Sequence, residues 1–346
     1  MRKLCLILGH TPTRGRGRRL ALGLILGMLL AGLTSRTSPA IAVDQSGDPV
    51  VAAVGDMACD PSDPNFNDGA GTATNCAEAR VSALMASKTT IDGVLGLGDY
   101  QYTCGDPNDF AVSYTPTWGV MNRWMTPVAG NHEYRTGTDP FGAVCPSTNS
   151  TAQQFFNYFS TSGSRWAGGG SHPGTAGHFS FNIGSWHIIA LNANCVNKGV
   201  GGCGASSPQT TWLASDLAST AKPCILAYWH QPRWTGTSSN NSTTATWWNL
   251  LYQRHADLVL NGHIHNYQRF AQLNANGQTD PNGIREVIVG TGGESLGPYA
   301  SNPTPKPSVR FRLFGYLRLV LHPGSYEASF IASDGTTKDN FSATCH

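Results

Sequence analysis

Five short polar segments, each directly after an apolar run, constrain the fold of this chain more than any other feature. They are Gly55-Asp56, Gly98-Asp99-Tyr100-Gln101-Tyr102, Gly130-Asn131-His132-Glu133, His230 and Gly262-His263-Ile264-His265. No fold needs this set of side chains for packing. Carboxylate and amide oxygens combined with imidazoles suit a pair of first-row transition ions, and the commonest task of such a pair is in-line hydrolysis of phosphate esters.

The apolar runs before these segments are short and rich in β-branched residues or leucine, as buried strands are. They cover residues 49–54, 93–97, 126–129, 224–229 and 257–260. Helical patterns lie between them at 76–88, 209–220 and 246–256. This alternation predicts an α/β fold, in which functional side chains gather at the carboxyl ends of the strands.

The pattern changes near the end of the chain, where three apolar runs follow one another without a helix. These runs, at 284–289, 313–321 and 326–332, predict a closing antiparallel meander or a sheet edge. The Gly290-Thr291-Gly292-Gly293 turn after the first run either brings backbone close to the polar segments or is a simple loop.

Residues 1–42 have the composition of an export signal. They contain seven basic residues and no acidic one, an apolar stretch from Leu20 to Leu33, and then Ala40-Ile41-Ala42. The Arg18-Arg19 pair fits a twin-arginine signal or belongs simply to the basic region. An apolar stretch of 14 residues is too short to span a bilayer, so we expect secretion without a stable membrane anchor.

Residues 43–346 are then expected to form a single domain, because no Pro-rich or charge-rich linker divides them. They carry 16 Lys and Arg against 21 Asp and Glu, a net charge of −5. A mildly acidic surface argues against nucleic-acid binding.

Eight of the nine cysteines lie after residue 42, and an even number in an exported chain favours disulfides over metal thiolates. The short spacing makes Cys195–Cys203 the most plausible local bridge. The simplest arrangement of the others pairs Cys59 with Cys76, Cys104 with Cys145, and Cys224 with Cys345.

In order and residue type, the five polar segments resemble those of the calcineurin-like metallophosphoesterases, and within them the purple acid phosphatase branch. The calcineurin-like family in general opens with an Asp-x-His motif, whereas Asp56 is followed here by Met57 and Ala58. Tyr102 stands where the purple branch places a tyrosinate ligand. The resemblance runs from about Val50 to Gly293 and implies a sandwich of two mixed β-sheets flanked by helices.

The resemblance also implies a set of metal ligands. Asp56, Tyr102 and His265 are expected to bind one ion, Asn131, His230 and His263 the other, and Asp99 to bridge them. A phenolate at the first position favours Fe(III), and the amide and imidazoles of the second fit divalent Zn, Mn or Fe.

The resemblance implies a phosphatase that hydrolyses small phosphomonoesters by in-line attack of metal-bound hydroxide. Together with the export signal, it predicts that this phosphatase is secreted. His132 is expected to hydrogen-bond the phosphate and assist the leaving oxygen, or else only to orient Asn131. Two other functions stay open: a dinuclear Zn or Mn phosphodiesterase acting on cyclic nucleotides or phospholipid headgroups, and a non-catalytic exported binding protein.

Overall fold

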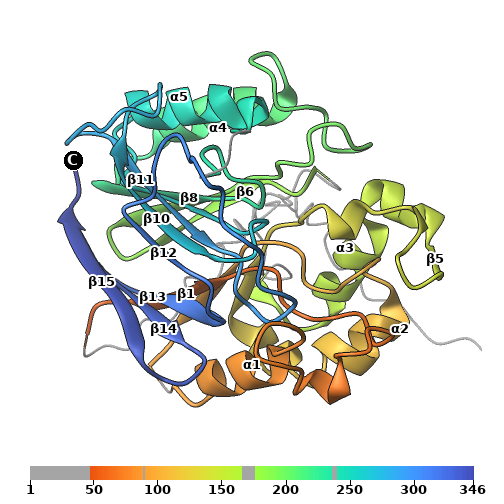
Figure 1. Ribbon diagram of the computed structural model, residues 1–346. Helices are drawn as coiled ribbons and strands as arrows, with labels where there is room; N and C mark the ends of the chain where they lie inside the picture. The colour runs from red at the N-terminus through yellow and green to blue at the C-terminus, as the bar shows by residue number, and fades with distance from the viewer. Residues whose placement is uncertain (1–46, 89, 166–175, 236–239) are drawn as a thin grey trace, which may run out of the picture. The chain divides into compact units, whose positions relative to one another are not determined.

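The computed structural model describes residues 47–88, 90–165, 176–235 and 240–346 (Figure 1). The expected export signal at 1–42 lies outside the described residues. The helices described are α1 (Glu78–Ala86), α2 (Pro107–Asp109), α3 (Gln153–Thr161), α4 (Pro208–Ser219) and α5 (Ala245–Gln253). None of them is long and apolar enough to cross a bilayer.

The described strands fall into two large sheets and one small hairpin. They are β1 (Val50–Val54), β2 (Gly93–Gly96), β3 (Met125–Pro127), β4 (Gly137–Thr138), β5 (Val144–Cys145), β6 (Phe179–Ile183), β7 (Trp186–Ala190), β8 (Cys224–Tyr228), β9 (Leu258–Asn261), β10 (Tyr267–Leu273), β11 (Ile284–Val289), β12 (Val309–Phe311), β13 (Gly315–His322), β14 (Ser325–Ala332) and β15 (Thr337–Thr344).

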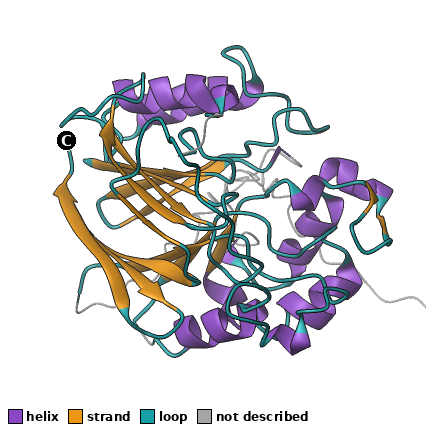
Figure 2. Ribbon diagram, in the orientation of Figure 1, coloured by secondary structure: helices purple, strands orange, loops and turns teal. Residues whose placement is uncertain are grey.

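Both large sheets are mixed, as the resemblance implied. The first has the order β15-β14-β13-β1-β2-β3 and the second β12-β10-β11-β9-β8-β7-β6, while β4 and β5 pair separately. In the first sheet β1, β2 and β3 run parallel. In the second, β7, β8, β9 and β11 run parallel. Figure 2 shows helices on the outer sides of the sheets.

The second sheet is apolar on both faces because it takes part in two hydrophobic cores. Leu226 and Leu260 belong to the core that also contains first-sheet residues, whereas Ala227 and Val259 belong to the core formed with α4 and α5. Successive side chains of a strand point to opposite faces, so each central strand must be apolar throughout. This explains the continuous apolar runs in the sequence.

Local signals fix the helix over the second sheet. The Ser207 Oγ accepts a hydrogen bond from the backbone N–H of Thr210 at 3.2 Å, and Pro208 occupies the first helical turn. A serine cap followed by proline is a strong helix start. The predicted helix at 209–220 is thereby confirmed as α4.

The predicted closing meander is partly wrong. β13 and β14 pair antiparallel and continue into β15, which the sequence pattern did not predict. β11 instead lies in the second sheet, parallel to β9 and antiparallel to β10. Nearly all of β11 is buried, which suits an interior strand rather than an edge. Strands β6, β7 and β10 and helix α3 were also not predicted.

All four expected disulfides are present: Cys59–Cys76, Cys104–Cys145, Cys195–Cys203 and Cys224–Cys345. The last one joins the start of β8 to the segment after β15, and so cross-links the two sheets.

Candidate metal centre

The carboxyl ends of strands from both sheets bring the predicted side chains together. Asp56 follows β1, Asp99 follows β2 and Asn131 follows β3, while His230 follows β8 and His263 follows β9. Asp56, Asp99 and His263 have positive φ angles of 58°, 53° and 69°. Such left-handed backbone is uncommon for residues other than glycine and clusters at functional sites.

One half of the site contains Asp56, Tyr102 and His265. The Tyr102 Oη lies 3.0 Å from Asp56 Oδ1 and 3.0 Å from His265 Nε2. The His265 Nε2 is 3.1 Å from Asp56 Oδ1. Three donor atoms from three distant segments therefore converge on one point.

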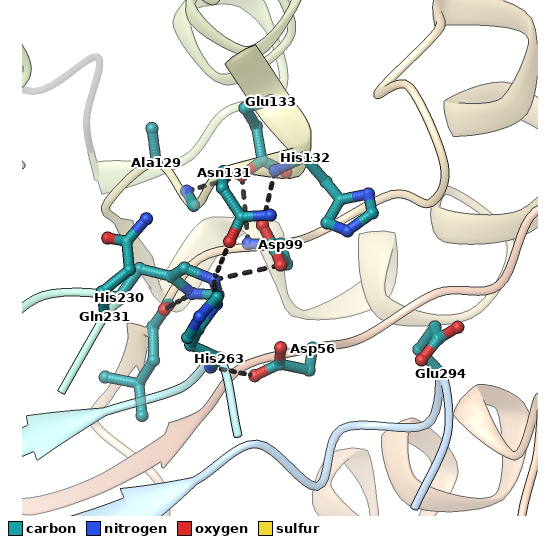
Figure 3. Close-up of polar contacts among 12 residues, drawn as sticks. Asp56, Asp99, Ala129, Asn131, His132, Glu133, His230, Gln231, His263 and Glu294 are labelled. Atoms are coloured by element: carbon teal, nitrogen blue, oxygen red, sulfur yellow. Dashed lines mark hydrogen bonds and ion pairs between the residues drawn. The ribbon is translucent and has the colours of Figure 1, made fainter. Parts of the chain in front are cut away.

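The other half contains Asn131, His230 and His263. The His230 Nε2 lies 3.1 Å from Asn131 Oδ1 and 3.3 Å from His263 Nδ1. Figure 3 shows Asp99 among the labelled side chains, with His230 and His263 on one side and Asp56 below.

Asp99 faces both halves. Its Oδ2 is 3.0 Å from Tyr102 Oη and 3.0 Å from His230 Nε2. Its Oδ1 accepts a hydrogen bond from the backbone N–H of His132 at 2.8 Å. Asp99 therefore lies between the two groups of side chains and contacts both.

The hydrogen bonding of His230 shows that this arrangement fits a cation. The His230 Nδ1 lies 2.8 Å from the carbonyl oxygen of Leu97, which can only accept, so Nδ1 carries a proton. In the neutral ring, Nε2 then presents a lone pair towards Asp99 Oδ2 and Asn131 Oδ1, which are also acceptors. A positive charge at this point removes the repulsion.

Spacing and electrostatics agree with that conclusion. Metal bonds of about 2.0–2.2 Å place adjacent ligand atoms ~3.0–3.5 Å apart, which matches the separations above. Burial lowers the pKa of His230, but Asp99 outweighs it and raises that pKa to about 9. The site therefore attracts positive charge, as a proton or as a metal ion.

The phenol of Tyr102 depends on the same charge. Burial raises its pKa well above the ordinary value, and Asp56 and Asp99 raise it further. Burial also raises the pKa of Asp99, but His230 and His132 outweigh it and hold that pKa well below the ordinary range. A phenolate at Tyr102 thus requires a nearby cation.

His132 borders the site with its ring held in place. Its ring centroid lies 4.1 Å from that of Tyr102. Its Nδ1 is 2.7 Å from the carbonyl oxygen of Thr103, so Nδ1 carries a proton. The Nε2 atom remains for a ligand.

Two acidic residues at the site had no predicted role. Buried Glu133 accepts hydrogen bonds from the backbone N–H groups of Asp99, Tyr100 and Gly130 at 3.0, 2.8 and 2.6 Å. It ties the second ligand segment to the third, and its position inside a predicted ligand segment was the available signal.

Glu294 contacts His265, with Oε2 2.9 Å from Nδ1. It follows the Gly290–Gly293 turn, which does approach the site: Gly292 N–H donates to Gly55 O at 2.9 Å and Glu294 N–H to Asp56 O at 3.2 Å.

Comparison with known proteins agrees with this geometry. The sequence matches the model of the calcineurin-like phosphoesterase family over residues 50–267. The chain belongs to this family. Among its curated relatives, human acid phosphatase type 7 is 26% identical over 265 residues, covering 68% of this chain and 56% of the relative. Purple acid phosphatase 15 of Arabidopsis thaliana is 27% identical over 202 residues, covering 56% and 35%.

The match thus spans about half or less of the length of these relatives. Among solved structures of the family's fold, a purple acid phosphatase from yellow lupin seeds has a TM-score of 0.60 at 18% identity, covering 88% of this chain and 55% of that chain. GAP50, described as an anchor in the inner membrane complex of Plasmodium, has a TM-score of 0.57 at 14% identity, covering 87% and 90%. Because a protein described as an anchor shares the fold, function has to be inferred from the side chains.

Proposed function

We propose that this chain is an exported, dinuclear metal-dependent phosphatase that hydrolyses phosphomonoesters. The observation that carries the proposal is the convergence of seven donor side chains into two halves that share Asp99. No packing requirement explains why His230 Nε2 lies 3.1 Å from Asn131 Oδ1 and 3.0 Å from Asp99 Oδ2.

The donor types differ between the two halves. Asp56, Tyr102 and His265 would hold the ion of higher charge, Fe(III), because they offer a carboxylate and a phenol that can ionise. Asn131, His230 and His263 would hold divalent Zn, Mn or Fe, since an amide oxygen and two neutral imidazoles bring no negative charge to offset a third positive charge. When bound, the pair would supply a water of lowered pKa and positive charge for the phosphate oxygens.

In this reaction His132 would serve as the proton donor. The Thr103 carbonyl oxygen fixes the Nδ1 proton, so Nε2 is the atom that gains or loses a proton. When protonated, Nε2 would donate a hydrogen bond to the phosphate. It would then transfer that proton to the leaving oxygen, as a general acid does.

Metal content and visible absorption of the purified protein test the proposal first. We expect two ions per chain, including iron, and a charge-transfer band that disappears in Tyr102→Phe. Two colourless ions would keep a hydrolase but replace Fe(III) by Zn or Mn. A protein that takes up no metal under any condition would refute the proposal.

His132→Ala should lower turnover of an aryl phosphomonoester by about 10²- to 10⁴-fold while both ions stay bound. The measurement pairs steady-state kinetics with metal analysis. Loss of an ion in the variant would show that His132 orients Asn131 instead. Faster turnover of a bis-aryl diester than of the monoester would favour the phosphodiesterase alternative.

The exported location rests on the composition of residues 1–42 and on the four disulfides, which form in oxidising compartments. Sequencing the N-terminus of protein recovered outside the cells would test it.

A further inference from the structure

We propose that Glu294, together with Ser295, orients and polarises His265 and thereby makes the Tyr102 half of the site selective for a trivalent ion. This inference rests on the proposed function. Glu294 is a positioning residue in this scheme, because it acts on the metal only through the imidazole of His265.

The first step is the hydrogen bonding of the His265 ring. Its Nδ1 lies 2.9 Å from Glu294 Oε2 and 2.7 Å from Ser295 Oγ. The Ser295 hydroxyl donates to the same Glu294 oxygen, so its proton is not available to His265. Nδ1 must therefore be the donor, and Nε2 is left as the atom that faces Tyr102 and Asp56.

The second step is a comparison with His230 in the other half. There the Nδ1 proton is held by the carbonyl of Leu97, a neutral acceptor. At His265 the acceptor is a carboxylate, which makes the imidazole a more basic ligand. The difference adds negative charge to the half that already contains Asp56 and Tyr102, and extra negative charge stabilises a trivalent ion more than a divalent one.

The third step is that the fold fixes Glu294 in place. The Glu294 carbonyl accepts the backbone N–H of Cys76 at 2.7 Å, and Cys76 is bridged to Cys59. Gly293 has φ of 144°, and a Cβ there would lie 2.5 Å from the Cα of Glu78, so only glycine fits. The Glu294 side chain is 19% exposed. Figure 3 shows Glu294 on the Asp56 side of the site, away from His230.

The test compares iron-loaded wild type with Glu294→Gln, which keeps the size of the side chain and removes its charge. We expect an affinity for the ion at the Tyr102 half that is about 10- to 100-fold lower. At a fixed potential, the Fe(III)/Fe(II) ratio should fall at least about tenfold, which for one electron is an upward shift of about 59 mV in midpoint potential. Metal titration and spectroelectrochemistry of the tyrosinate band give these values without relying on activity.

Two further variants keep the test decisive. Glu294→Asp keeps the charge but moves it away from His265 Nδ1, so it should raise the midpoint potential by less than Glu294→Gln does. If Glu294→Gln does not fold, the presence of this smaller upward shift supports the inference and its absence rejects it. Glu327→Gln removes a carboxylate whose side chain is 70% exposed, and it should match wild type.

Three results would overturn the inference. A wild type with two ions and the tyrosinate band, but with an unchanged potential and affinity in both Glu294 variants, would reject it and leave the proposed function standing. A wild type with two colourless ions would reject the trivalent preference while keeping a hydrolase. A wild type that takes up no metal would reject both proposals.

Discussion

Glu78 illustrates how much a single buried carboxyl near the metal centre can influence the stability of the protein. Its side chain is fully buried at the start of α1. The Ser113 hydroxyl donates to Oε1 at 3.2 Å, but Oε2 has no hydrogen-bond partner among the described residues. Burial outweighs the hydrogen bonds and raises the pKa of Glu78 from 4.5 to about 7.

A raised pKa makes the folded protein bind its proton more tightly than the unfolded chain does. The resulting stability is complete below pH 4.5 and is lost as pH rises through 7. Glu78→Gln cannot titrate, so its free energy of unfolding relative to wild type should rise by up to about 3 kcal/mol between pH 4 and pH 8. Denaturant unfolding of both metal-loaded proteins at several pH values checks this, and a pH-independent difference would contradict it.

Residue types at the ends of the apolar runs indicated a two-metal site, because carboxylate and amide oxygens together with imidazoles are metal ligands by their chemistry. The assignment of each ligand, Tyr102 above all, came from the resemblance to the metallophosphoesterases. The side chains that hold the ligands did not share that property. Glu294 is an ordinary acidic residue in the sequence, and its contact with His265 exists only after β10 and β11 bring the two segments together. The orienting role of the Leu97 carbonyl had no side-chain signal at all.

At the scale of elements, the close approach of strand ends sets the spacing of the ligands. A Cβ added to Gly130 would lie 2.1 Å from Asp99 Oδ1 and 2.5 Å from Asp99 N. The turn after β3 therefore packs directly on the residue after β2. Any side chain at this position must move Asp99 or Asn131.

Gly130→Ala should accordingly weaken metal binding and lower activity by about 10²-fold or more, the usual effect of a displacement near 1 Å at a reacting centre. Metal analysis and kinetics would measure both effects. Gly204→Ala is the matched control, because a Cβ there meets nothing within 4 Å. Equal activity of the two variants would show that the turn after β3 tolerates a side chain.

Strands with a clear apolar run were predictable, but their partners were not. β11 and β13 look alike as apolar segments, yet the first pairs with β9 and the second with β1. Hydrophobic periodicity reports which faces are buried and carries no information on which neighbour buries them. The polar β15, largely exposed, gave too weak a pattern to predict.

For the molecule as a whole, the Cys224–Cys345 disulfide closes the longest loop of the four, with a sequence separation of 121. Its loss should release the most conformational entropy in the unfolded chain. We expect Cys224→Ala/Cys345→Ala to lower the free energy of unfolding by about 2–5 kcal/mol.

Because Cys224 lies at the start of β8 and His230 follows the end of that strand, the bridge-deficient enzyme should keep its activity at low temperature. Denaturant unfolding and kinetics together check both statements. The Cys195→Ala/Cys203→Ala variant, which opens a loop with a separation of only 8, should lose less stability. A larger loss there would contradict the dependence on loop length.

The pairing of β1 with β13 has a consequence for the order in which the protein folds. Val50 pairs with Val320, 270 positions later. During synthesis β1 therefore cannot pair with its antiparallel neighbour until nearly all of the domain has been made. Until then the strand that leads to Asp56 has an open edge, and pairing across such a separation is slow. The metal centre is therefore expected to become complete only late in biosynthesis. A prematurely terminated chain would leave an unpaired apolar strand edge that is prone to aggregation, and it would lack a complete metal centre.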